Sequence, residues 1–513
     1  MSQPGTIGWF AQHEVRLAWR DWLSLMTAGS RRRARTVAIG FIVFAGFVHG
    51  LAYLMLTSSA NFASSADARV LVVLTGTLVT AWSLMLSQAL ESVTRAFYAR
   101  GDLELILSSP AAASRLFAVR IAAMAVTIVA LALVLAGPFI NVLVWLGGAH
   151  WLGGYVAIVA LAMDAVAISV VLTVALFRAI GPRRTRVVAQ IVAAVVGAAF
   201  AIGMQIAAIV SYGTMSRMAI LRSAVLVRLA PDADSLVWWP ARAVLGEPVA
   251  LAALVTLSVA ALAATIYMFA PRFGQFALAA ASVSEGPARR SNRGRSRFRT
   301  VSPAQAMRHK EWTLLLRDPW LMSQTLMQLL YLLPAVFVLW RSFSGGGMTA
   351  LLVPVLIMAA GQLGGGLAWL AVSGEDAPEL IATAPVPTAQ ILRAKTEAVL
   401  GGVAVVFGPL VVLLAVVSPI GGLVALGGVT VAAGSSTAIQ YWFRTQARRS
   451  LFRRRQTSSR IATFAEALSS TLWAGTGALV AAATWLAVFP AVMVVLIVAG
   501  AWMISPERSA KPS

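Results

Sequence analysis

The sequence YARGDLELILSSPAAASRLFAVR occupies residues 98–120 and forms a charged segment between two long apolar runs. A second segment, SGEDAPELIATAPVPTAQILRAK at residues 373–395, matches it in register. Five pairs of identical or similar residues lie 275 positions apart: Glu104 and Glu379, Leu105 and Leu380, Ile106 and Ile381, Pro110 and Pro385, and Arg120 and Lys395. A polar segment repeated inside an apolar chain indicates a docking surface that is used twice.

The composition is that of a membrane protein. Of the 513 residues 59% are hydrophobic and 12% are charged, about half the charged share of a soluble protein. The apolar residues form blocks of about 20, the length at which a helix crosses the hydrocarbon core. Because backbone amides in lipid must be bonded within their own segment, the blocks predict helices, and the alternating pattern of membrane barrels is absent. The expected fold is all-α and polytopic, with about 12 transmembrane helices.

The expected spans form two parallel repeats of six helices each. The first half is residues 1–270, a basic flexible cytoplasmic linker follows at 271–302, and the second half is 303–513. Spans are expected at 37–56, 70–92, 121–143, 155–177, 187–211 and 248–270, and then at 321–340, 349–371, 397–417, 422–443 and twice within 461–504. The semi-apolar external segment 212–247 is expected to form short helices that re-enter the outer leaflet.

The net charge of +22 could point to nucleic acid, but the positions of the basic residues argue against it. Most of the 41 Lys and Arg fall in the segments expected on the cytoplasmic side, as the positive-inside rule requires. Membrane lipids are therefore the expected partner of this charge, and nucleic acid is not. Both termini are expected in the cytoplasm.

An amphipathic helix is expected before the first span of each half. Residues 10–26 interleave bulky apolar side chains with charged ones, which is typical of a helix in the membrane interface. Three charged residues recur 297 positions later: Glu14 as Glu311, Arg20 as Arg317, and Asp21 as Asp318. An ordinary cytosolic helix is the alternative interpretation of this pattern.

The chain lacks the residue patterns of an energy-converting or catalytic site. It has no Gly-x-x-x-x-Gly-Lys-Ser/Thr loop to cradle phosphates, no cysteine, and four histidines that do not pair at metal-ligand spacing. We therefore expect no catalytic residue, no metal and no cofactor on this chain. A lipid-modifying enzyme is disfavoured because no cluster of acids, histidines or nucleophiles is present.

Two acids, Asp164 and Glu466, fall within expected spans. Gradient-driven carriers place such acids in their spans as proton or cation sites, so a 12-span secondary transporter is the alternative function. Asp164 fits an interhelical contact equally well, and Glu466 fits a snorkelling or capping role near the inner surface. The loop between spans two and three also lacks the Gly-rich, Asp-Arg-containing pattern of the facilitator-type carriers.

An amphipathic helix, two spans, the Asp-Leu-Glu-Leu-Ile-Leu-Ser-Ser-Pro run at 102–110 and four more spans resemble the membrane subunit of bacterial ABC-2 type (type V fold) exporters. The chain resembles the fused variety, with two six-span permeases in one polypeptide. The resemblance implies that the helix before the first span is the elbow helix, and that the segment between spans two and three is the coupling helix, which sits in a groove of an ATPase.

The resemblance implies that the two segments offer carboxylates and apolar anchors to that ATPase, and plain solvated loops are the alternative interpretation. The residues concerned are Asp102, Leu103, Glu104 and Leu107 in the first copy and Glu375, Asp376, Glu379 and Leu380 in the second. The second copy departs from the first, because Ala377 replaces Asp102 and two prolines, Pro378 and Pro387, are added.

The resemblance implies an exporter of the bacterial inner membrane, with ATP and magnesium bound by two copies of a separate ABC ATPase. The scarcity of charge in the spans favours an amphiphilic or hydrophobic cargo such as a lipid, a peptide or a drug-like molecule. Asp164, Gln362 and Gly365 are candidates for the substrate path, although the glycines of the Gly364–Gly366 run fit close helix packing as well.

Overall fold

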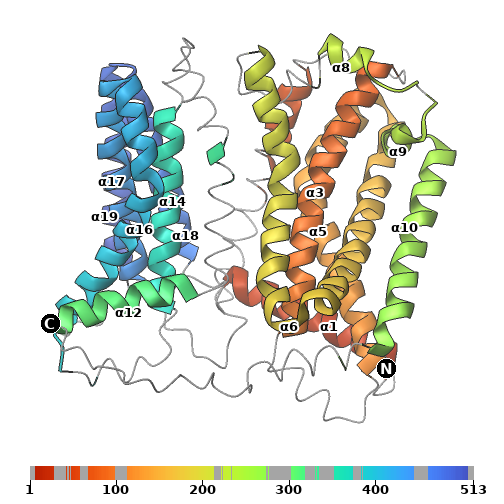
Figure 1. Cartoon of the computed structure of the whole chain (residues 1–513). Helices are drawn as coiled ribbons and strands as arrows, with labels where there is room; N and C mark the ends of the chain where they lie inside the picture. The colour runs from red at the N-terminus through yellow and green to blue at the C-terminus, as the bar shows by residue number, and fades with distance from the viewer. Residues whose placement is uncertain are drawn as a thin grey trace. The chain divides into compact units, whose positions relative to one another are not determined.

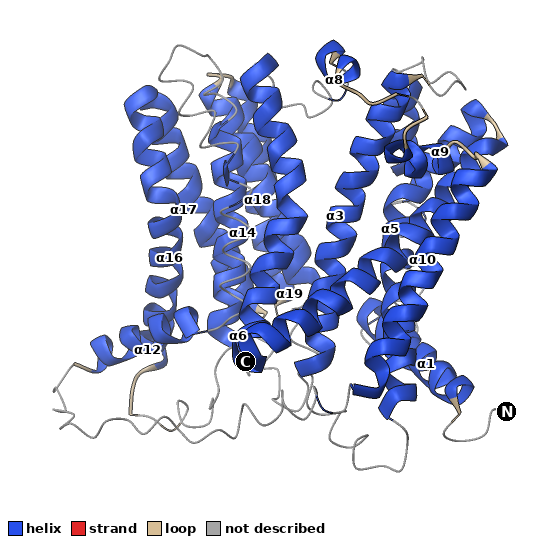
Figure 2. Ribbon diagram, turned by 45° about the vertical axis from the view of Figure 1, so that its right-hand side comes forward, coloured by secondary structure: helices blue, strands red, loops and turns tan. Residues whose placement is uncertain are grey.

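The computed structural model describes residues 6–27, 42, 45–46, 48–57, 67–98, 113–212, 221, 223–232, 234–272, 275, 302–317, 330, 332–333, 352–373, 383, 385–443 and 460–505. Every regular element in these ranges is a helix (Figure 2). Nine of the described helices are long and apolar enough to cross a membrane. The protein is therefore a multi-pass helical membrane protein. The chain divides into two compact units, Met1–Arg290 and Ser291–Ser513.

The first unit contains the long helices α3 (Ala68–Tyr98), α5 (Ala113–Gly147), α6 (Gly153–Tyr212) and α10 (Pro248–Phe269), as Figure 1 shows. The amphipathic helix α1 (Ile7–Thr27) lies across their lower ends in that view. It covers the stretch expected at 10–26, and its Phe10 is buried against Leu116 and Val119 of α5. Burial of one apolar face against α5 fixes this helix at the ends of the spans.

Helix α6 contains the fourth and fifth expected spans and is broken at Gly181, within the connection expected at 178–186. The two long apolar helices here are Ala149–Pro182 and Val187–Ala208, and the non-helical dihedrals lie where the first of them ends, at Gly181, with φ 74° and ψ 165°. Glycine adopts this left-handed φ without steric cost, and Pro182 begins the next turn with a φ that suits a helix. The two spans expected here are therefore separate helices that meet at a single residue.

Small residues bring α3 and α6 together in the first unit. Ala89 of α3 and Ala162 and Ala165 of α6 are fully buried, and the Ser169 hydroxyl is bonded to the Leu86 carbonyl across the interface at 3.4 Å. Lipid tails are as apolar as the side chains, so close backbone approach and interhelical hydrogen bonds stabilise such pairs. An aromatic cluster of Phe97, Phe117 and Phe177 closes the end of the unit where α3 ends and α5 begins.

Short helices occupy the segment between α6 and α10. They are α8 (Ala224–Arg228), η2 (Leu236–Trp238) and α9 (Trp239–Val244), and a further short helix, η1 (Ala149–Leu152), precedes α6. Gly246, with φ 81°, turns the chain from α9 into α10, where a Cβ would lie 2.6 Å from the His150 carbonyl oxygen. These elements agree with the short helices expected there, while their re-entry into the leaflet stays a prediction.

The second unit contains α12 (Pro303–Arg317), α14 (Leu352–Ser373), α16 (Thr388–Val417), α17 (Pro419–Trp442), α18 (Arg460–Ala481), η6 (Trp485–Ala487) and α19 (Val488–Ile504). Within this unit α12 lies across the ends of the long helices, as Figures 1 and 2 show. Helix α18 corresponds to the eleventh expected span but is not among the nine apolar helices, because it carries Glu466 and several hydroxyl groups. Of the first expected span, 37–56, the structure describes residues 42, 45–46 and 48–56, and Val48–Thr57 form a short apolar helix. Most of the seventh expected span, 321–340, lies outside the described residues.

Glycines and serines bring α14, α17 and α18 together. A Cβ on Gly364 would lie 3.1 Å from Ala433 Cα of α17, and one on Gly361 would lie 2.5 Å from the Ser470 hydroxyl of α18. Two hydroxyl pairs, Ser435 with Ser469 at 3.1 Å and Ser436 with Ser470 at 3.3 Å, join α17 to α18. Part of the glycine run therefore serves close packing, the alternative interpretation from the sequence.

Candidate functional site

The two segments expected to dock an ATPase lie between described helices. In the first unit α3 ends at Tyr98 and α5 begins at Ala113, and in the second α14 ends at Ser373 and α16 begins at Thr388, so both connections contain the same number of residues. All eight docking residues fall outside the described residues: Asp102, Leu103, Glu104, Leu107, Glu375, Asp376, Glu379 and Leu380. The functional geometry is therefore built from the helices that hold these segments.

A buried ion pair joins α12 to α16 in the second unit. The Lys395 ammonium lies 3.0 Å from Glu311 Oε1, and the two side chains are only 10% and 1% exposed. The same ammonium donates to the carbonyl of Ala371, in the last turn of α14, at 2.5 Å. One charge thus ties α12 to the helix that precedes the second docking segment and to the helix that follows it. Cations favour the carboxyl end of a helix, which suits this position.

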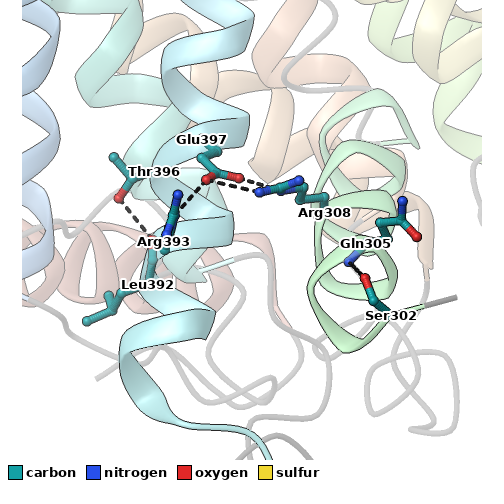
Figure 3. Close-up of polar contacts among 7 residues, drawn as sticks. All are labelled: Ser302, Gln305, Arg308, Leu392, Arg393, Thr396 and Glu397. Atoms are coloured by element: carbon teal, nitrogen blue, oxygen red, sulfur yellow. Dashed lines mark hydrogen bonds and ion pairs between the residues drawn. The ribbon is translucent and has the colours of Figure 1, made fainter.

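A second ion pair fastens the same two helices. Arg308 of α12 donates from Nε to Glu397 Oε2 of α16 at 2.5 Å, and Arg393 donates to the other carboxylate oxygen at 2.9 Å (Figure 3). The Ser302 hydroxyl accepts from the Gln305 amide at 3.3 Å and caps the start of α12. In the buried pair α12 carries the acidic residue and α16 the basic one, whereas in the second pair α12 carries the basic residue and α16 the acidic one. This alternation of charge specifies the register of α12 on α16.

The first unit contains the corresponding pair. Arg120 Nε of α5 lies 4.0 Å from Glu14 Oε1 of α1, and both side chains are largely buried. Glu14 precedes Glu311 by the 297 positions that separate the two amphipathic stretches, and Arg120 precedes Lys395 by the 275 that separate the two charged segments. Residues that are matched by two independent sequence offsets therefore form the same contact in each unit.

The remaining residues expected in the two amphipathic helices are placed by their helices. Arg20 is exposed on α1, Asp21 lies near the end of α1, and Arg317 ends α12. Asp318 falls outside the described residues. Among the side chains of this set that the structure describes, Glu14 and Glu311 connect their helix to another.

The chain was compared with protein-family models, characterised proteins and solved structures. No match was found.

The candidates for a substrate path lie apart from the ion pairs. Asp164 of α6 lies beside the buried Ser258 of α10 in the first unit. In the second unit Gln362 is exposed on α14, whereas Gly365 is buried. A Cβ on Gly365 would lie 2.0 Å from Glu466 Oε1, and Gln440 donates to the other oxygen of that carboxylate at 2.5 Å. Gly365 thus provides the space that a carboxylate between α14, α17 and α18 occupies.

The Arg308–Glu397 pair was not found by sequence reasoning. The repeat could not reveal it, because the positions that the two offsets assign to it in the first half are Ala11 and Ala122. Gln440 and the contact of Gly365 with Glu466 were missed as well, since nothing in the local sequence pairs residues so far apart in the chain. Lys395 and Arg120 were marked in the sequence by their match across the repeat. That match did not identify the residues with which they pair.

Proposed function

We propose that the chain is the transmembrane permease subunit of an ATP-binding cassette exporter, and that ATP is hydrolysed by a separate subunit. The observation that carries this proposal is the ion pair formed in each unit, Glu14 with Arg120 and Glu311 with Lys395. Each pair joins an amphipathic helix to the long helix that follows a charged segment. That is the place at which the resemblance to type V permeases puts the elbow helix and the coupling helix.

This arrangement suits a membrane domain that is moved by a separate ATPase. An ATPase outside the membrane can move a span only through a rigid connection. A buried, hydrogen-bonded ion pair is a more rigid connection than an exposed one. Lys395 belongs to α16, which follows the connection 374–387 of the second charged segment, and its ammonium contacts Glu311 of α12 and the Ala371 carbonyl of α14, which precedes that connection. A displacement of that segment would therefore move α12, α14 and α16 together.

The proposal includes partners and a location. Two copies of an ABC ATPase, carrying ATP and magnesium, would bind the charged segments at the cytoplasmic face of the bacterial inner membrane. Both termini would lie on that face, and the two units would act as parallel halves. The cargo would be amphiphilic or hydrophobic, such as a lipid, a peptide or a drug-like molecule, because the long helices carry few charges.

Affinity purification tests the proposal directly. The full chain, tagged and extracted in mild detergent from its own cells, is expected to bring down an ATPase with Walker motifs. The matched control is a variant in which one carboxylate of each segment is replaced by arginine, Glu104→Arg with Glu379→Arg, which should enter the membrane but lose the ATPase. If the wild-type chain is recovered in an active state without any such ATPase, it is not an ABC permease.

A gradient-driven carrier is the second candidate, and Glu466 is the observation that favours it. Its carboxylate lies within α18 and accepts from Gln440, as a proton-binding group in a span would. Transport by the purified chain in vesicles, with no ATPase present and abolished by a protonophore, would support the carrier. Transport that requires both the ATPase and ATP, and that persists in the protonophore, would support the exporter.

A further inference from the structure

Two arginines from different helices line one groove in the first unit. Arg178 lies on α6, and Arg272 lies on the short helix η3 (Ala270–Arg272) that follows α10. Between them the groove is walled by apolar and aromatic side chains, including Tyr267, Met268 and Phe269, and its volume is about 680 Å³. We propose that this groove binds an anionic phospholipid, with the headgroup phosphate between the arginines and an acyl chain along the end of α10.

The groove lies at one end of the first unit. Ala270 belongs to the same buried cluster as Phe97, in the last turn of α3, and Phe117, in the first turns of α5. Arg178 directly follows Phe177, another member of that cluster. The arginines are therefore at the level where α3 ends and the connection 99–112 to α5 begins. A headgroup in the groove would lie in the interface of a bilayer that surrounds these helices.

The chain offers these arginines no acidic neighbour on their own helices. Its sequence has no Asp or Glu between Asp164 and Asp232, nor between Glu247 and Glu285. In the part of the chain that the structure describes, neither arginine forms an ion pair. Two exposed guanidinium groups beside an apolar wall attract an anion, and their planar donors fit a phosphate bidentately.

The wall distinguishes a lipid from a free anion. The Tyr267 side chain is 82% exposed and that of Met268 is 53% exposed, so α10 presents apolar surface next to the arginines. A free phosphate would gain nothing from that surface, whereas an acyl chain would cover it. Tyrosine is also a residue that membrane proteins place at headgroup level. A ligand that matches both the charge and the wall has an anionic head and an apolar tail.

The test uses the purified full chain in a non-ionic detergent without ATPase, so it is independent of the proposed transport function. Fluorescent phosphatidylglycerol and phosphatidylcholine with the same acyl chains are titrated into wild type and into the double variant Arg178→Gln with Arg272→Gln. Wild type should bind phosphatidylglycerol more tightly, and the double variant should lose about tenfold or more in affinity for it. Excess inorganic phosphate should not displace the lipid.

A matched control separates a built site from general surface charge. Arg16 of α1 and Arg184 of α6 are exposed in the same unit, so Arg16→Gln with Arg184→Gln removes the same charge elsewhere. This variant should bind phosphatidylglycerol within about twofold of wild type. The proposal is wrong if both variants weaken equally, if the two lipids bind alike, or if inorganic phosphate displaces the lipid. The single variants Arg178→Gln and Arg272→Gln provide the same comparison should the double variant not fold.

Discussion

Glu311 is a buried carboxylate whose charge is balanced by its neighbours, Lys395 at 3.0 Å and Lys310 at 3.2 Å. Glu311→Gln should lower the stability of the second unit by about 3 kcal/mol, because the Lys395 ammonium then stays buried beside a neutral group. Removing both charges, by Glu311→Leu with Lys395→Met, should cost less than the single change. Thermal unfolding of the purified chain in detergent measures both, and a double variant less stable than the single one would contradict the role of the pair.

Gly365 and Gly366 are adjacent, yet only the first has a neighbour in the space that a Cβ would enter. Gly365→Ala would place its Cβ against the Glu466 carboxylate, whereas nothing lies within 4 Å of a Cβ on Gly366. We expect Gly365→Ala to destabilise the unit by about 1–3 kcal/mol through overpacking, and Gly366→Ala to have little effect. The double variant Gly365→Ala with Glu466→Ala should recover part of the loss in a thermal-unfolding assay. Equal melting temperatures for the two single variants would rule out this contact.

At the scale of elements, α12 is held on α16 by a partly exposed pair in addition to the buried one. Glu397→Gln removes the negative charge that pairs with Arg308 and Arg393, and the loss in stability should be small because the pair is solvated. Hydrogen exchange of the α12 amides should nevertheless become faster, because one of the two ion pairs that hold α12 on α16 is lost. Glu91→Gln is the matched control: it removes the exposed pair with Arg95 within α3 and should leave α12 unchanged.

How well the sequence predicts each helix depends on the physical property that the sequence pattern reports. The nine apolar helices were predictable because a run of about 20 apolar residues has few alternatives to a span. Their ends were not: α16 begins at Thr388, although the apolar run was expected to begin at residue 397. Hydropathy reports where lipid ends, whereas the helix continues as long as its backbone bonds are made.

The candidate site was predictable only where the repeat carried it. Glu14, Glu311, Arg120 and Lys395 each had a counterpart at a fixed offset, so the sequence marked them before any contact was known. Arg308 and Glu397 had none, and charge alone does not say which of many exposed residues will meet. Sequence offsets thus identify what the two halves share, and contacts between helices identify where they differ.

At the scale of the whole molecule, the ion pairs that the described residues form between an amphipathic helix and a long helix differ between the two units. The second unit uses a pair at 3.0 Å and adds the Arg308–Glu397 pair, whereas the first unit has its pair at 4.0 Å and alanines at the positions that correspond to the addition. If an ATPase pushes on both charged segments, the stiffer connection transmits more of each stroke. The two halves of the proposed permease should therefore not contribute equally to coupling.

Charge reversal in one segment at a time tests this asymmetry. With the partner ATPase reconstituted, Glu379→Arg should reduce the stimulation of ATP hydrolysis more than Glu104→Arg does, because it lies in the segment held by the buried Lys395. The double variant should abolish stimulation without affecting membrane insertion. Insertion can be checked by labelling a single introduced cysteine, since the chain has none of its own. Normal stimulation in the double variant would refute docking at these segments, whereas equal losses in the two single variants would refute only the asymmetry.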